Sequence, residues 1–215
     1  MNPANSKQAV ELATKVQKGV QSAHAKIVLC PPFVFIPQLL PEKNIQIGAQ
    51  NCSWKEQGSL TGEVSPWQLK SFGCSYVILG HSERKKYLDE TLSMVAKKSI
   101  AAKKAGLIPI LCVENVAELR SLKVKIRNFK SVVVVFEPSS AISTQGGKHI
   151  APKDIAMMTH EMKKIIGKTV PILYGGSVDA KSIAGIMQEG KVQGVLVGAA
   201  SLNAREFLSL VKSAL

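Results

Sequence analysis

Residues 76–84 read Tyr76-Val77-Ile78-Leu79-Gly80-His81-Ser82-Glu83-Arg84 and decide the fold class predicted for this chain. The first four form an apolar run without alternation, which is typical of a strand covered on both faces of a parallel sheet. A glycine follows, and then a histidine and a glutamate two positions apart. In α/β folds, chemistry is carried by side chains at the carboxyl ends of such strands. His81 is therefore a candidate catalytic residue.

A second predicted strand ends in a carboxylate. The apolar run 132–135 leads into Phe136-Glu137-Pro138, which places Glu137 at the mouth of another buried strand. An imidazole and a carboxylate at two strand ends make a candidate acid–base pair. The polar, glycine-containing segment 141–147 then follows. It is either a plain surface loop or a lid that excludes water from a bound substrate.

Strands and helices alternate along the chain. Periodicity predicts an opening helix at 6–23 and later helices at 36–40, 66–72, 92–105, 116–121, 152–166, 180–188 and 204–214. Repeated β-then-α units belong to either a barrel or a doubly wound sheet. Without a linker, one domain is expected over residues 1–215. The predicted strands lie at 26–30, 45–50, 76–79, 109–113, 132–136, 171–174 and 194–197.

Composition excludes several classes of function. The 215 residues contain no apolar run of the roughly 20 that a spanning helix needs, so no membrane contact is expected. The N-terminal residues lack the apolar core of a signal peptide, which predicts a cytoplasmic protein. The formal charge is +13, but the lysines are spread over many predicted helices and carry no RNA-binding signature. Nucleic-acid binding is therefore not expected, whereas small anionic substrates would be attracted.

The four cysteines do not predict a metal site. Cys30, Cys52, Cys74 and Cys112 have no metal-ligand spacing, and two of them lie in or at the end of predicted strands. Reduced thiols in or near the core are expected.

Two glycine-containing segments late in the chain are candidate phosphate sites. Tyr174-Gly175-Gly176-Ser177-Val178 ends one predicted strand and is expected to open a helix, and Gly198-Ala199-Ala200-Ser201 ends the next. Small residues let backbone N–H groups approach an anion, and a helix N-terminus adds a favourable field. Tight turns use the same residues, so each segment alone leaves both readings open.

Together these motifs resemble the triosephosphate isomerase family, and the resemblance runs from residue 1 to residue 215. Several separate motifs occur in the order that the family has them. They are Gln50-Asn51 with 61–65 (a dimer-forming loop), 78–84 (the histidine signature), 110–114 (a strand), 136–138 with 141–144 (base and lid), and 174–178 and 197–202 (phosphate loops).

The resemblance implies a (β/α)₈ TIM barrel and an isomerase of glycolysis and gluconeogenesis that needs no cofactor. It would interconvert dihydroxyacetone phosphate and D-glyceraldehyde 3-phosphate through an enediolate. Glu137 would move the proton between neighbouring carbons, and His81 would polarise the carbonyl as a neutral imidazole, an arrangement of which this family is itself a known example. Glu83 and Tyr174 would have supporting roles.

The resemblance also implies a substrate-binding set and a partner. The phosphate of the triose would lie against Ser143, Ser177, Gly198 and Ala199, largely on backbone N–H groups. Thr61 would lie in the loop that reaches a neighbouring subunit, which implies a homodimer.

The chain departs from the family pattern at its start. Met1 and Asn2 match only the last two residues of the family's Asn-x-Lys-Met-Asn motif, so the first strand is expected to be missing from this sequence. The motif's lysine, which adds positive charge to the phosphate and the enediolate, would stand just before Met1. An alternative function follows: a catalytically impaired barrel that keeps phosphate binding and dimer contacts. A form extended by that strand is expected to be more stable and more active.

Smaller departures concern the lid and the fifth helix. Ser139-Ser140 stand at the lid hinge, where the family often has Val-Trp, and Ser143 and Ala199 each replace a glycine. The short segment between the strands at 109–113 and 132–136 predicts a small or irregular fifth helix.

Overall fold

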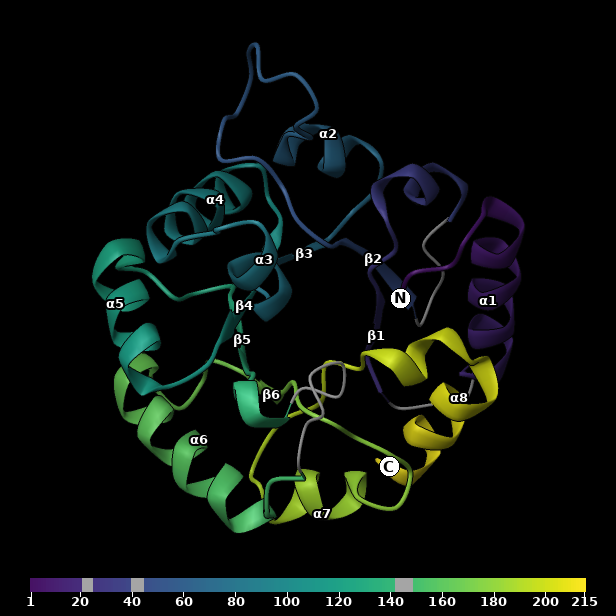
Figure 1. Cartoon of the computed structure of the whole chain (residues 1–215), viewed down its shortest axis with the longest axis vertical. Helices are drawn as coiled ribbons and strands as arrows, with labels where there is room; N and C mark the ends of the chain where they lie inside the picture. Colours follow the sequence, from purple (N-terminus) through teal and green to yellow (C-terminus); the bar gives the residue numbers. More distant parts are fainter. Residues whose placement is uncertain (21–24, 40–44, 142–148) are drawn as a thin grey trace.

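A curled parallel sheet forms the centre of the molecule, and helices form a ring around it (Figure 1). The computed structural model describes residues 1–20, 25–39, 45–141 and 149–215. The strands pair in chain order, each parallel to the next. They are β1 (Ile27–Leu29), β2 (Ile45–Ala49), β3 (Tyr76–Leu79), β4 (Ile108–Val113), β5 (Val133–Phe136) and β6 (Ile172–Tyr174).

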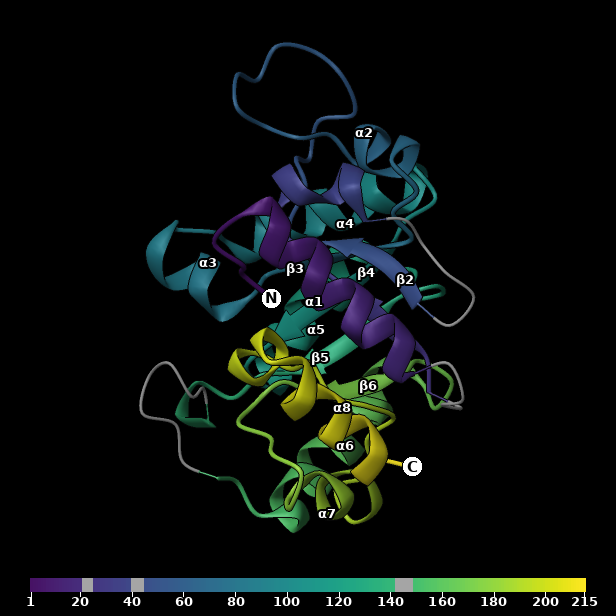
Figure 2. The ribbon, with the colours of Figure 1, turned by 90° about the vertical axis from the view of Figure 1, so that its right-hand side faces the viewer.

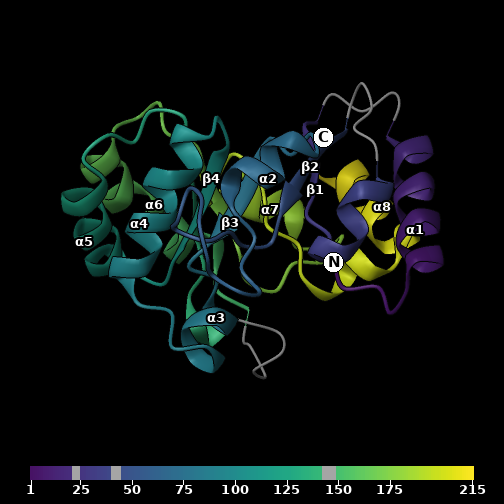
Figure 3. The same cartoon turned by 90° about the horizontal axis from the view of Figure 1, so that it is seen from above.

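Most helices cover the outer face of the sheet, whereas α3 lies at one end of it (Figures 1 and 3). The segment that leads into α2 projects beyond the body of the molecule, whereas the first and last helices pack against each other (Figures 2 and 3). No helix of the described residues is both long and apolar enough to cross a membrane. The helices are α1 (Ser6–Gly19), α2 (Pro66–Ser71), α3 (Ser82–Tyr87), α4 (Leu92–Lys104), α5 (Val116–Ile126), α6 (Pro152–Ile166), α7 (Ile183–Gln188) and α8 (Ala204–Ser213), with 3₁₀ helices η1 (Phe33–Gln38), η2 (Ser139–Ala141) and η4 (Ala199–Leu202).

The strands are buried on both faces. In β3, Val77 and Leu79 belong to the large core beneath the helices, whereas Tyr76 and Ile78 belong to a smaller cluster with Cys112 of β4. Successive side chains of a strand point to opposite faces, so β3 contributes to both clusters. This explains the apolar runs without alternation and confirms the α/β barrel-like fold class.

Six of the predicted strands are confirmed, and the seventh is wrong. The segment 194–197 makes a single bridge, between Val195 and Tyr174, and forms no strand. Its ladder consists of two hydrogen bonds, from Tyr174 N–H to the Gly194 carbonyl and from Leu196 N–H to the Tyr174 carbonyl. Within the described residues, β1 pairs only with β2, so the sheet is open along its other side.

The predicted helices at 116–121 and 36–40 differ from the observed ones, and the α-helix at Ser82–Tyr87 was not predicted. The fifth helix, α5, is regular and 11 residues long because Asn115 caps it and Leu119, Leu122 and Ile126 bury one face. The segment at 36–40 corresponds to η1, a 3₁₀ helix. Helix α3 was missed because its sequence, SERKKY, has no buried face.

The turn that joins β3 to α3 requires a glycine. Gly80 has φ +72°, and a Cβ built on it would lie 3.2 Å from the Cys112 carbonyl oxygen and 3.1 Å from Val95. We expect Gly80→Ala to lower the free energy of unfolding by more than the ~1–2 kcal/mol that the left-handed backbone alone costs. Urea denaturation measures this loss.

The matched control for this prediction is Gly106→Ala. Gly106 has φ +78°, but its nearest neighbour is a flexible lysine carbon at 3.6 Å. This variant should show the backbone cost alone. Equal losses in the two variants would mean that the crowding at Gly80 has no energetic effect.

Candidate active site

His81 caps the helix that follows β3. It is the N-cap of α3, and its Nδ1 accepts the backbone N–H of Glu83 at 3.4 Å. A ring nitrogen that accepts a hydrogen bond is unprotonated, so in the neutral imidazole the proton lies on Nε2. The cap therefore selects the tautomer and points a donor away from the helix.

Glu137 is the first residue after β5, and it is buried. Only 3% of the residue is exposed, and its backbone N–H donates to the Val113 carbonyl at 2.8 Å. Its Oε1 lies 2.9 Å from His81 Nε2, and its Oε2 accepts the backbone N–H of Ser82 at 2.9 Å. The structure thus brings the predicted acid–base pair into direct contact and leaves neither carboxylate oxygen without a donor. Sequence analysis missed the role of Ser82, because its backbone N–H makes the contact and the type of side chain gives no sign of it.

The charge state of His81 depends on this contact. Burial lowers the pKa of the imidazole, but the hydrogen bond and charge of Glu137, together with the charge of Glu83, outweigh burial and raise the pKa above its ordinary value of 6.5. The resemblance implied a neutral imidazole. In the structure the pKa shifts the other way because the Glu137 carboxylate is the partner of the ring.

A buried ion network holds the turn that carries the histidine. The Glu90 carboxylate accepts the N–H of Gly80 at 3.2 Å and pairs with Arg84 Nε at 3.1 Å. The buried Lys98 ammonium pairs with Glu90 and donates to Asn51 at 2.9 Å. Burial raises the pKa of Glu90, but Lys98 and Arg84 outweigh it and lower the pKa. Sequence reasoning missed this network because Asn51 and Lys98 are 47 positions apart.

The glycines after β6 allow close packing around Glu137. A Cβ at Gly175 would lie 2.6 Å from Val135 and 3.5 Å from the Cβ of Glu137, and one at Gly176 would overlap the ring of Tyr174. Tyr174 is itself buried against Phe136, with ring centroids 6.3 Å apart. The expected helix opening at this segment is wrong, because α7 begins only at Ile183.

The two predicted phosphate segments differ in their surroundings. The N–H and the hydroxyl of Ser177 both donate to the Ala141 carbonyl, at 2.8 and 3.0 Å, which ties this loop to the segment after Glu137. Gly198 and Ala199 are exposed, and a Cβ at Gly198 would meet nothing within 4 Å. The fourth predicted residue, Ser143, lies outside the described residues.

The remaining predicted residues lie at the edge of the site or far from it. The Glu83 side chain is 53% exposed, and its Oε2 lies 3.8 Å from His81 Nδ1. Thr61 is exposed in the segment that precedes α2. A cavity of about 220 Å³ lies beside that segment, lined by Ser53, Lys55, Gln57, Gly58, Leu60, Glu63, Ser65, Trp67 and Gln68, and not by the acid–base pair.

Fold and site together define an α/β barrel-type protein in which an imidazole and a carboxylate meet at the carboxyl ends of two strands. The family model for triosephosphate isomerase matches residues 1–214. A triosephosphate isomerase of Shewanella frigidimarina is 38% identical, covering 96% of this chain and 91% of the relative. One of Caldanaerobacter subterraneus is 37% identical, covering 95% and 92%. The chain belongs to the triosephosphate isomerase family, whose members are isomerases.

The His81–Glu137 contact predicts a pH dependence. In Glu137→Gln, the pKa of His81 should fall, because a neutral amide no longer stabilises the imidazolium. NMR titration of the ring measures this shift, and the spectrum of His81→Asn assigns the resonance among the four histidines. An unchanged pKa would show that the two side chains do not meet in solution.

The same shift sets the direction of the stability change. Because the folded-state pKa of His81 is raised, its stabilising contribution is fully present below the unfolded pKa of about 6.5 and is lost as pH rises through the folded pKa. The stability difference between wild type and Glu137→Gln should therefore be larger near about pH 5.5 than near about pH 8.5.

Proposed function

We propose that this chain interconverts dihydroxyacetone phosphate and D-glyceraldehyde 3-phosphate by proton transfer through an enediolate. The observation that carries the proposal is the 2.9 Å contact between His81 Nε2 and Glu137 Oε1 at the carboxyl ends of two strands. Membership of the triosephosphate isomerase family supports the substrate. The test is an isomerase assay with glyceraldehyde 3-phosphate.

The geometry supports a division of labour between the two side chains. The Glu137 carboxylate takes the proton from the carbon next to the carbonyl, and the electron pair of that C–H bond forms the enediolate. The Nε2–H of His81, which donates to Glu137 in the free site, donates instead to the substrate oxygen. Glu137 then returns its proton to the neighbouring carbon, while the hydroxyl proton on one substrate oxygen passes to the other oxygen by way of His81 Nε2, so no cofactor is consumed.

The phosphate group is proposed to bind beside Gly198 and Ala199. Open space at Gly198 supports this position, because a phosphate oxygen can approach the backbone closely there. Ser177 lies on the neighbouring loop, where its N–H is engaged with the Ala141 carbonyl in the free site. Donation by this N–H to phosphate would require that bond to be exchanged.

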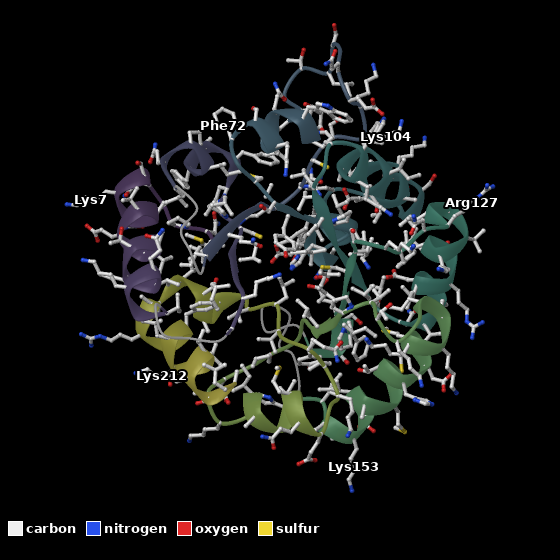
Figure 4. The ribbon with its side chains drawn as sticks, turned by 180° about the vertical axis from the view of Figure 1, so that it is seen from behind. Lys7, Phe72, Lys104, Arg127, Lys153 and Lys212 are labelled. Atoms are coloured by element: carbon white, nitrogen blue, oxygen red, sulfur yellow. The ribbon has the colours of Figure 1, made fainter. Side chains whose placement is uncertain are left out.

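We also infer a cytoplasmic homodimer without a nucleic-acid partner. The segment that projects before α2 supports the dimer, because it offers a second subunit a surface that the body of the molecule does not cover (Figure 2). The four free thiols support a reducing compartment. Lys7, Lys104, Arg127, Lys153 and Lys212 point outward at separate places around the rim, which argues against one concentrated nucleic-acid surface (Figure 4).

Removing the base tests the proposed chemistry. Glu137→Gln keeps the size of the side chain and should lower kcat at least a hundredfold, since positioned proton transfer contributes about 10²–10⁴. Glu11→Gln, on the exposed face of α1, is the control and should leave kcat unchanged. If Glu137→Gln kept more than half of the wild-type rate, Glu137 would have to be removed from the mechanism.

A charge placed at Gly198 tests the phosphate position. Gly198→Asp should weaken binding of inorganic phosphate or phosphoglycolate, because a carboxylate would face the anion. The open space at this position accommodates the side chain. Gly198→Asn has the same shape without the charge, so it should weaken binding less. Inhibition constants measure both variants, and equal affinities for wild type and Gly198→Asp would place the phosphate elsewhere.

A further inference from the structure

A hydrogen bond outside the acid–base pair holds the segment that follows the base. The hydroxyl of Ser139 donates to Glu114 Oε1 at 2.5 Å. Ser139 is two residues after Glu137, and Glu114 is the first residue after β4. None of the contacts that place His81 against Glu137 includes this pair.

The segment 137–139 is therefore hydrogen-bonded to two consecutive residues at the end of β4. The Val113 carbonyl accepts the backbone N–H of Glu137 at 2.8 Å, and Glu114 accepts the Ser139 hydroxyl. Between the two anchors stands Pro138, whose ring fixes φ and leaves the segment few ways to bend. A two-point attachment of this kind restrains the direction in which the intervening carboxylate leaves the strand.

Glu114 is held in turn by an ion pair that reaches the other half of the site. Its backbone N–H donates to Glu118 Oε2 at 2.8 Å, and the same oxygen lies 2.8 Å from Lys85 Nζ. The Lys85 and Glu118 side chains are only 20% and 19% exposed. Lys85 belongs to α3, the helix that His81 caps. These contacts thus connect residues 137–139, through the start of α5, to α3, the helix that His81 caps.

We propose that Ser139 and Glu114 are positioning residues for Glu137, which hold its carboxylate in register with His81. This inference rests on the proposed function for its kinetic consequence but not for its structural one. Ser139 is exposed, so its hydrogen bond adds little to global stability. A small displacement of a base, however, lowers turnover strongly, because proton transfer requires close alignment with the substrate.

The test removes the hydroxyl and measures both geometry and turnover. In Ser139→Ala, kcat should fall about three- to tenfold while KM stays within about twofold, since the lost contact orients the base and does not touch the phosphate. The pKa of His81, followed by NMR in the substrate-free protein, should fall toward its value in Glu137→Gln. Ser139→Thr keeps the hydroxyl and should restore both quantities.

The neighbouring serine provides the matched control. Ser140 is equally exposed and lies in the same turn of η2, and its hydroxyl makes no hydrogen bond with the described part of the chain. Ser140→Ala should therefore match wild type in kcat and in the pKa of His81. Glu114→Ala should reproduce Ser139→Ala, and the double variant should be no worse than either, because both remove the same contact.

The outcomes separate this inference from the proposed function. A wild-type pKa of His81 in Ser139→Ala overturns the positioning role, whatever the activity does. If Ser140→Ala had the same effects as Ser139→Ala, the role would also be overturned, because the effect would then belong to the turn and not to the hydroxyl. A protein without isomerase activity, whose His81 pKa still falls in Ser139→Ala, would refute the proposed function and leave the positioning role supported.

Discussion

The backbone hydrogen bond from Glu137 to the Val113 carbonyl extends the β4–β5 ladder by one residue beyond the strand. The rest of the site depends on this extension, because it fixes where the chain carries the carboxylate after β5. Gly175 continues the pattern by donating to the Phe136 carbonyl. Parallel pairing brings the carboxyl ends of neighbouring strands to one edge, so Glu137 meets His81 although they are far apart in sequence.

A buried carboxylate imposes a second constraint. Removing Glu137 from water is costly unless its oxygens are hydrogen-bonded, and both donors come from the turn after β3. Both oxygens of the buried carboxylate are therefore satisfied by His81 and Ser82. The raised pKa of His81 follows from this contact with the Glu137 carboxylate.

The glycines near the site have different physical reasons. Gly80 is required by a positive φ and by the approach of the Cys112 carbonyl, and Gly176 by the ring of Tyr174. Gly198 faces open space and is constrained by neither. Of these three glycines, only Gly198 leaves room for an anion, although all three look alike in the sequence. The difference lies in neighbours that come from other strands and loops.

Only the resemblance to a known family distinguished a barrel from a doubly wound sheet. The residues by themselves determined the α/β class, six of the strands, and the candidacy of His81 and Glu137. These features depend on local apolar runs and on the residues that directly follow them. Sequence analysis failed for residues 194–197, which read as a strand, because strand formation requires partners that a local run does not reveal. It also failed for α3, whose polar sequence has no apolar period to detect.

Only the tertiary structure decided the tautomer of His81, the occupation of both Glu137 oxygens and the buried pairing of Lys98 with Glu90. It also decided that Ser139, and not Ser140, contacts Glu114. The physical reason is the same in each case. Hydrogen bonds and ion pairs act over a few ångströms between groups distant in sequence, so they are set by the register of the strands and the packing of the helices and not by local pattern.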